Sequence, residues 1–237
     1  MTTLIEPGET GDRAAFLATV RNAIGRAPQN HARPIEPLPS PLPIVEYSTL
    51  GVLRTDGGQQ HAKSQFGEAL TALGGAVRTI ADGHELAALL DDALAFARRG
   101  DSPVRVVLSD DPECDRLREH LAAREDVELL DYDNAETVAT ADLGITGAHS
   151  AVALTGSIVV DAGRAGGRTV SLLPPVHLAL VHAETIVATP GEHWRGLAEP
   201  MPSNMVQITG PSRSADIELI ITLGVHGPRA LWVGVLG

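Results

Sequence analysis

The chain has 237 residues, and its 43% hydrophobic and 20% charged residues are typical of a globular protein rather than a disordered one. This length suits one large α/β domain or two small ones, with enough apolar side chains for a sizeable core. The net charge of -12, without any basic stripe, argues against nucleic acid and anionic membrane surfaces as partners.

The N-terminal part of the chain differs in composition from the rest. Residues 10–25 (TGDRAAFLATVRNAIG) carry apolar residues at helical spacing and predict a first helix that ends at Gly25. Six of the 16 prolines follow between Pro28 and Pro43, which is typical of an extended arm. We therefore predict a helix and a proline-rich arm over residues 1–45 and one α/β domain over residues 46–237. The first residues lack the basic and apolar regions of a signal peptide, and no apolar run is long enough for a membrane span.

Helix and strand patterns then alternate along the chain. The best-defined helical pattern lies in residues 82–100, where Asp82 and Glu85 form a capping box before an apolar face. Further helices are predicted over residues 61–75 and from Pro112 onward, and strands over residues 76–81, 104–111 and 127–133. Such alternation predicts an α/β fold with a mainly parallel sheet flanked by helices on both faces.

The second half changes character from Ala141 onward. Short β-like runs are separated by glycines, and residues 163–167 (GRAGG) have the composition of a tight turn. We expect several strands and hairpins in this glycine-rich region.

Several turns of this half could meet at the carboxyl ends of the parallel strands, where such sheets bind their ligands. Thr146-Gly147 and Thr155-Gly156 each place a hydroxyl and a glycine at a predicted strand end. Backbone amides at such turns bind anions, and arginine binds a carboxylate or phosphate through two hydrogen bonds. Arg168, beside the glycine-rich turn, is a further candidate for an anion contact.

Residues 209–228 (TGPSRSADIELIITLGVHGP) allow two interpretations. In one, Ser212 and Arg213 bind a small anion, and Asp216 and Glu218 are candidates for a catalytic role. In the other, a serine caps a short helix, and the two acidic residues complement its dipole.

The histidines of the glycine-rich half raise the question of a metal or acid–base site. A metal site would need three or four converging ligands, and the spacing of His149, His177, His182 and His226 supports none, so we expect no metal. His177 follows a double proline and suits either an acid–base role or a hydrogen-bonded structural role.

Cys114 is the single cysteine of the chain. It cannot form an internal disulfide or hold an iron–sulfur cluster, which needs about four thiolates. A single cysteine without a disulfide partner favours the cytoplasm as the compartment of the chain. A helix start after Pro112 would lower the pKa of the thiol, but the surrounding acidic residues would raise it. We expect neither a catalytic thiol nor a cluster in this chain.

Four stretches of the second half together resemble the LUD domain family, in particular its lactate utilization protein C group. They are GITGAHSAVALTGSIVV (144–160), GGRTVSLLPPVHLALV (166–181), QITGPSRSADIELIITLGVHGP (207–228) and LWVGVLG (231–237). The resemblance is strong from about Ala141 to Gly237 and looser before it. The pairing of Thr-Gly-Pro-Ser-Arg with Gly-Val-His-Gly-Pro is its most specific signature.

This resemblance implies a fold similar to the NagB/RpiA/CoA-transferase-like α/β class. It also implies a role in oxidising L-lactate to pyruvate, together with two iron–sulfur partner proteins. The chain would then be the accessory subunit without clusters, binding a small carboxylate or phosphorylated ligand. The resemblance assigns no catalytic residue. A stand-alone enzyme of CoA-transferase or sugar-phosphate isomerase-like type is the alternative that the fold resemblance allows.

One position departs from the family pattern. The family's usual Ala-Glu-Thr-Gly reads Ala-Leu-Thr-Gly here, with Leu154 in place of the acidic residue. Any chemical role of that carboxylate would be absent from this chain.

Overall fold

The computed structural model describes residues 58–163, 168–197, 202–215, 221–224 and 226–237, together with Ala15, Leu17, Ala18, Thr19 and Asn22. Those five N-terminal residues are helical and fall inside the predicted first helix. The chain divides into two units, Met1–Glu46 and Tyr47–Gly237, and the sheets and the helices from α2 onward all belong to the second unit. The proline-rich arm lies outside the described residues, so its extended form stays a prediction.

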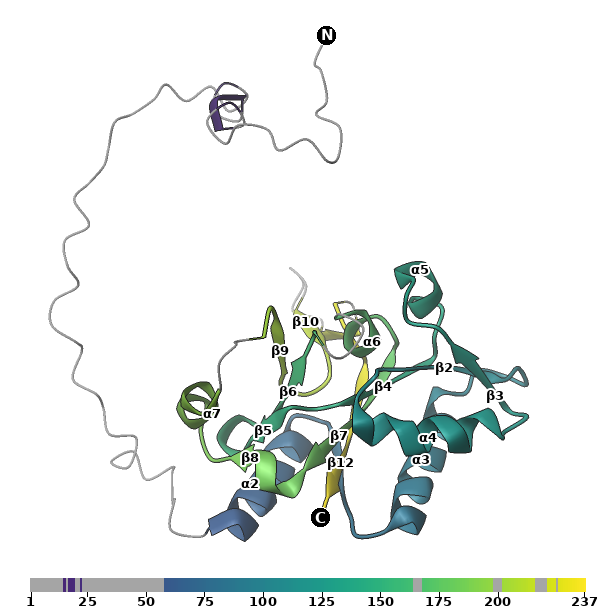
Figure 1. Cartoon of the computed structure of the whole chain (residues 1–237), viewed down its shortest axis with the longest axis horizontal. Helices are drawn as coiled ribbons and strands as arrows, with labels where there is room; N and C mark the ends of the chain where they lie inside the picture. Colours follow the sequence, from purple (N-terminus) through teal and green to yellow (C-terminus); the bar gives the residue numbers. More distant parts are fainter. Residues whose placement is uncertain are drawn as a thin grey trace, which may run out of the picture. The chain divides into compact units, whose positions relative to one another are not determined.

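A six-stranded sheet forms the centre of the second unit (Figure 1). All its strands are parallel, which confirms the prediction from the alternating pattern. In spatial order they are β1 (Ala76–Ile80), β12 (Ala230–Leu236), β7 (Val176–His182), β4 (Leu143–Gly147), β2 (Val104–Leu108) and β3 (Val127–Leu130). The last strand of the sequence thus lies between β1 and β7, next to the edge strand β1.

Two helices, α3 (Gly83–Ala97) and α4 (Pro112–Ala122), pack on one face of this sheet. The side chain of Asp82 accepts hydrogen bonds from the backbone N–H groups of His84 and Glu85 at 2.9 Å, and it thereby caps α3 as predicted. Glu85 bonds back to the N–H of Ala81 at 2.6 Å, one residue before the position that the capping box requires. Leucines of α3 and α4 interdigitate with valines and leucines of the strands to form the larger core.

The opposite face is covered by α2 (Gly58–Ala72) and a second, four-stranded sheet. This mixed sheet runs in the order β8 (Ile186–Val187), β5 (Ser150–Val152), β6 (Ser157–Asp161) and β9 (Met205–Ile208). The turn η3 (Ala153–Thr155) joins β5 to β6, which forms one of the expected hairpins. Leu154, in η3, is partly buried, and its N–H bonds to the carbonyl of Ala188 at 3.0 Å.

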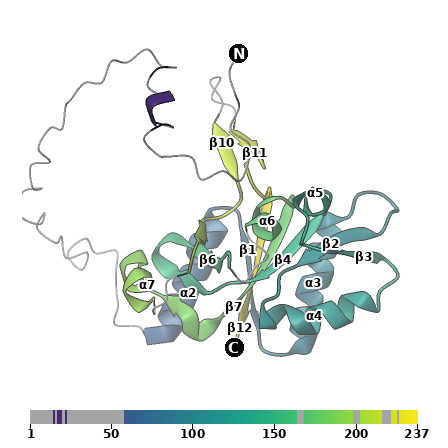
Figure 2. The same ribbon diagram turned by 45° about the horizontal axis from the view of Figure 1, so that its top comes forward.

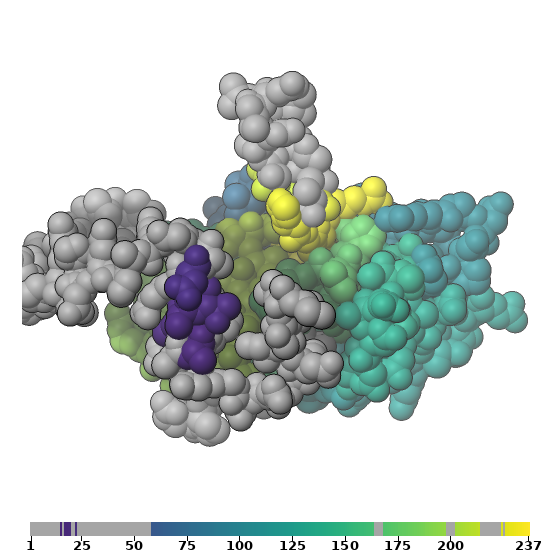
Figure 3. All heavy atoms as spheres, turned by 90° about the horizontal axis from the view of Figure 1, so that it is seen from above, coloured from purple at the N-terminus to yellow at the C-terminus, as the bar shows by residue number. Residues whose placement is uncertain are grey.

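Short helices complete this side of the molecule. They are α5 (Ala135–Val138), α6 (Thr169–Leu172) and α7 (Pro190–Gly196), with the turn η4 (Ala183–Thr185) before β8. α5 and α6 contact each other near the amino ends of the parallel strands. Figure 3 shows this end of the second unit from above. A Cβ on Gly144 would lie 2.1 Å from the carbonyl oxygen of Val170, so only glycine permits this approach of α6 to β4.

The predicted signature near the C-terminus forms a two-stranded antiparallel ribbon, β10 (Arg213–Ala215) and β11 (Ile221–Leu223), which projects from the body (Figure 2). Residues 213–215 are therefore strand, and the interpretation in which a serine caps a short helix at this point is wrong. The N–H of Ser212 bonds instead to the carbonyl of Pro228 at 2.8 Å, and its carbonyl accepts from Gly224 at 3.0 Å. These bonds fix the base of the ribbon.

Candidate functional site

A cleft of about 380 Å³ opens at the carboxyl ends of β1, β12 and β7, between the first turns of α3 and helix α4. A second hollow of about 300 Å³ adjoins it and shares four of its lining residues: Leu86, Arg116, His182 and Leu236. Ligands of parallel α/β sheets bind in this position, beyond the carboxyl ends of the strands. The cleft is therefore the candidate site.

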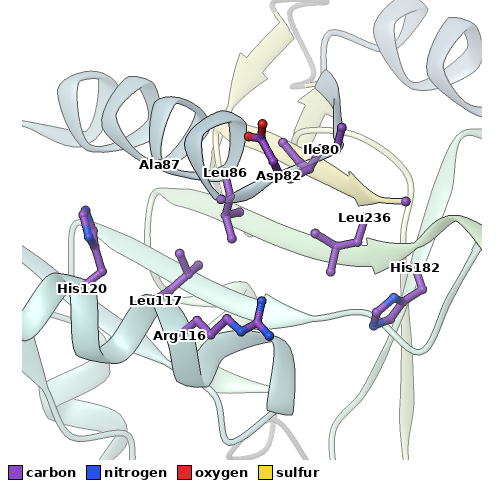
Figure 4. A pocket seen from close by; sticks show the side chains of 12 residues that line it. Ile80, Asp82, Leu86, Ala87, Arg116, Leu117, His120, His182 and Leu236 are labelled. Atoms are coloured by element: carbon purple, nitrogen blue, oxygen red, sulfur yellow. The ribbon is translucent and has the colours of Figure 1, made fainter.

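The polar side chains of the cleft come from three elements (Figure 4). His182 ends β7, and its Nε2 lies 3.2 Å from Oε1 of Glu113 in the first turn of α4. Arg116 and His120 follow on α4, and Asp82 stands at the start of α3. Figure 4 shows the Arg116 side chain lying across the cleft from Leu86, between His120 and His182.

A hydrogen-bond network around Asp111 lies at the start of α4. The Asp111 carboxylate is buried, and its Oδ2 accepts from the hydroxyl of Ser109 at 2.6 Å and from the N–H of Gly147 at 3.0 Å. Asp111 makes no side-chain hydrogen bond to the first turn of α4, although it stands at the N-cap position. The amino end of α4, with its positive dipole, thus faces the hollow without a side-chain cap.

Gly147 is the predicted ligand residue that lies nearest this network. A Cβ at this position would come within 2.7 Å of Cβ of Asp111 and 2.8 Å of Oε2 of Glu113. Any larger residue would push both acidic side chains aside. Gly147 therefore positions Asp111 and Glu113 through its small size and its N–H group.

Thr146 and His177 lie on the other face of the sheet. Both are fully buried, and the Thr146 hydroxyl is 2.9 Å from Nε2 of His177. Burial lowers the pKa of His177 to about 3, so the imidazole is neutral near pH 7. Its Nδ1 has no hydrogen-bond partner among the described residues. His177 lies away from the cleft, in agreement with the opposite orientation of residues five apart on one strand.

Thr155 and Gly156, two further predicted ligand residues, lie near the end of α2. The Thr155 hydroxyl is 2.7 Å from that of Ser157, which is 2.8 Å from the hydroxyl of Thr209. Gly156 has φ +61° and packs against the backbone of α2, where a Cβ would lie 2.5 Å from the N atom of Leu70.

Ser212 and Arg213 also bond within the protein. The Arg213 guanidinium donates a hydrogen bond to the carbonyl of Leu73, just beyond α2, and the Ser212 hydroxyl accepts from the N–H of His226 at 3.4 Å. Arg168 is exposed at the start of α6, which precedes β7, whereas the cleft opens at the carboxyl end of that strand. Asp216 and Glu218 lie outside the described residues.

Cys114 is buried in α4, next to Ser109. Burial, followed by the charges of Asp111 and Glu113, raises the pKa of the thiol to about 12, whereas the Ser109 hydrogen bond and Arg118 act in the other direction. The thiol is therefore protonated and poorly nucleophilic near neutral pH.

A buried histidine that the sequence did not single out lies in α7. Nδ1 of His193 is 2.9 Å from the Ser150 hydroxyl, and its ring meets that of His149 edge to face, with centroids 6.0 Å apart. Burial, with a smaller contribution from His149, lowers the pKa of His193. Across the described part of the chain, no three His, Cys, Asp or Glu side chains are arranged to hold a metal ion. No helix in that part is both long and apolar enough to cross a membrane.

Sequence reasoning missed the cleft residues Arg116, His120 and the His182–Glu113 pair. Arg116 and His120 are four apart on a helix, and this spacing places them on one face. Glu113 and His182 are 69 positions apart, so only the sheet order brings them together. The sequence signal that could have found Glu113 and His182 was their position, since one stands at a helix start and the other at a strand end.

Comparison with known proteins identifies the family. Residues 64–235 match the model of the LUD domain. The lactate utilization protein C of a Geobacillus strain is 30% identical over 95% of both chains. The protein of that name from Halalkalibacterium halodurans is 37% identical over 55% of this chain, and that from Anoxybacillus flavithermus is 40% identical over 44%. These last two alignments span 62% and 50% of the relatives' own lengths.

A solved structure agrees with the fold. The DUF162 family protein from Deinococcus radiodurans superposes with a TM-score of 0.54 at 24% identity, covering 76% of this chain and 98% of its own. That likeness supports the α/β architecture described above. The family model spans most of the present chain, including the parallel sheet except for the last residue of β12. The chain therefore belongs to the LUD domain family.

Proposed function

We propose that this chain acts in lactate utilization as a cytoplasmic accessory subunit that binds a small anion and works with iron–sulfur partner proteins. The observation that carries the proposal is the alignment with a lactate utilization protein C over 95% of both chains. The reaction in question is the oxidation of L-lactate to pyruvate, in which two electrons leave the substrate and pass to a redox centre.

The cysteine content supports an accessory role. An iron–sulfur cluster needs about four thiolates, whereas the sequence contains only Cys114. That thiol is buried, and its pKa is raised to about 12, so it is poorly suited to bind metal as a thiolate. Clusters that accept electrons from lactate would therefore belong to the partners.

A stand-alone small-molecule enzyme is the second candidate. The His182–Glu113 pair favours it, because a histidine held by a carboxylate at a cleft is a common acid–base arrangement. Such an enzyme would turn over a substrate without partners, which distinguishes the two proposals in solution.

Deletion of the gene in its native host tests the first proposal. We expect the strain to lose growth on L-lactate as sole carbon source, to keep growth on glucose, and to recover when the full chain is restored. Normal growth of the deletion strain on L-lactate would overturn the proposal.

A pull-down identifies the partners. Tagged full chain from cells grown on L-lactate should co-purify with coloured, cysteine-rich proteins, and the complex should reduce a dye when L-lactate is added. A chain that purifies alone and turns over a metabolite without partners would favour the second candidate.

A further inference from the structure

Arg116 carries a positive charge at the edge of the cleft that no described residue pairs with. Other arginines of the fold are used internally: Arg78 pairs with Asp92, Arg98 with Asp126, and Arg124 with Asp91 and Asp126. The exposed Arg116 makes no hydrogen bond or ion pair with any residue that the structure describes. Its five N–H donors are therefore available to a ligand.

Two carboxylates lie near Arg116 without pairing with it: Asp82 lines the cleft, and Glu113 lines the adjoining hollow. Asp82 accepts two backbone hydrogen bonds at the start of α3 through its Oδ1. Glu113 lies three residues before Arg116 on the same helix, but its Oε1 faces His182. Both carboxylates nevertheless give the cleft a negative contribution, which a monoanion tolerates better than a dianion because like charges repel.

Part of the cleft wall is apolar. Leu86 of α3, Leu117 of α4 and Leu236 of β12 line it, and Figure 4 shows Leu86 and Leu236 on the side of the cleft opposite Arg116. A volume of about 380 Å³ exceeds what a three-carbon acid fills and suits a ligand with a larger apolar part. One free guanidinium beside leucine side chains fits a ligand with one anionic end and one apolar end.

We propose that this cleft binds an organic monocarboxylate with an apolar stem, whose carboxylate is held by Arg116 and whose carbon chain lies against Leu86, Leu117 and Leu236. The inference rests on the proposed binding of a small anion and gives that anion a place and a chemical class. His182, held by Glu113, stands at the far end of the cleft, where it can donate to or accept from a polar group of the ligand.

Calorimetric titration of the purified full chain with butanoate, hexanoate, octanoate, L-lactate and inorganic phosphate tests the proposal. We expect saturable binding of the carboxylates, with affinity rising by up to about fourfold for each added methylene that is buried. Arg116→Gln should weaken hexanoate binding by about tenfold or more, the scale of a charge-assisted hydrogen bond.

Arg195→Gln is the matched control. Arg195 lies in α7, outside the cleft, and its guanidinium also makes no ion pair with a described residue, so this variant should bind hexanoate like the wild type. Failure of the carboxylates to bind, tighter binding of phosphate than of hexanoate, affinity independent of chain length, or equal affinity in the Arg116→Gln variant would each overturn the proposal.

The outcome is separable from that of the proposed function. A chain that is required for growth on L-lactate but binds no carboxylate contradicts only the inference about the cleft. A chain that binds hexanoate through Arg116 but is dispensable for growth on L-lactate contradicts only the role in lactate utilization.

Discussion

Two polar regions of this molecule differ in how their hydrogen-bonding groups are used. Around the end of α2, the hydroxyls of Thr155 and Thr209 both lie within hydrogen-bond distance of Ser157, and Arg213 bonds to the carbonyl of Leu73. At the carboxyl edge of the sheet, Arg116 points into a cleft and has no partner among the described residues.

A polar residue that belongs to a conspicuous sequence pattern is thus not necessarily a residue whose hydrogen-bonding groups are available to a ligand. Most of the polar residues of the signature stretches bond to the protein itself, so their side chains stabilise the junction between α2, the small sheet and the β10–β11 ribbon. A group that recognises a ligand must keep donors or acceptors that the fold does not use. By this criterion the cleft is the better candidate, and substitutions in the two regions test the distinction.

The largest effect is expected for Gly156→Ala at the α2 junction. The left-handed φ of +61° and the 2.5 Å approach to Leu70 N should together lower the free energy of unfolding by about 2–4 kcal/mol. Urea denaturation measures this change. The control is Gly67→Ala, on α2 with open space around its Cβ, which should raise stability by up to about 1 kcal/mol. Equal stability of the two variants would refute tight packing at Gly156.

His177 should make the fold sensitive to acid. The pKa of His177 is lowered from its ordinary value of 6.5 to about 3 in the folded protein. The unfolded chain therefore binds a proton at this histidine more tightly than the folded protein does. The contribution of neutral His177 to the free energy of unfolding is therefore fully present above pH 6.5 and is lost as the pH falls toward 3. Between pH 7 and pH 5 this loss amounts to about 2 kcal/mol.

Urea denaturation at pH 7 and pH 5 measures this effect, with His177→Gln as the comparison. The wild type should lose about 2 kcal/mol more than the variant over this interval. Parallel pH dependence in the two proteins would contradict the lowered pKa of His177, because it requires equal proton binding by this group in the folded and unfolded states.

A smaller effect is expected for Arg213→Gln. Loss of the charged hydrogen bond to Leu73 should lower the free energy of unfolding by about 1 kcal/mol, because the guanidinium is exposed and partly hydrated. An anion site at Arg213 would instead require a loss of ligand affinity on the scale of about 1–3 kcal/mol. Measurement of both quantities on the same protein separates a structural role from a binding role.

Much of the fold could be predicted from local patterns. The capping residue Asp82, the proline at the start of α4 and the alternation of helices and strands were sufficient for the parallel sheet and its flanking helices. The position of β12 between β1 and β7 could not be predicted, since strand order depends on contacts between distant segments.

The site was harder to predict for the same reason. Thr146 and Gly147 were correctly placed at the end of one strand. Thr146, however, bonds to the buried His177, and Gly147 contacts Asp111 and Glu113 through its N–H group and its small size. Glu113 and His182 become neighbours only when β4 and β7 align beside α4. No local pattern carries that information.

The most direct test of binding at the cleft measures hexanoate affinity and melting temperature in parallel for the wild type, Arg116→Gln and Arg213→Gln. We predict that Arg116→Gln loses affinity by about tenfold or more while keeping its melting temperature, and that Arg213→Gln loses melting temperature while keeping its affinity. The reverse pattern, with affinity lost only in Arg213→Gln, would contradict the assignment of binding to the cleft.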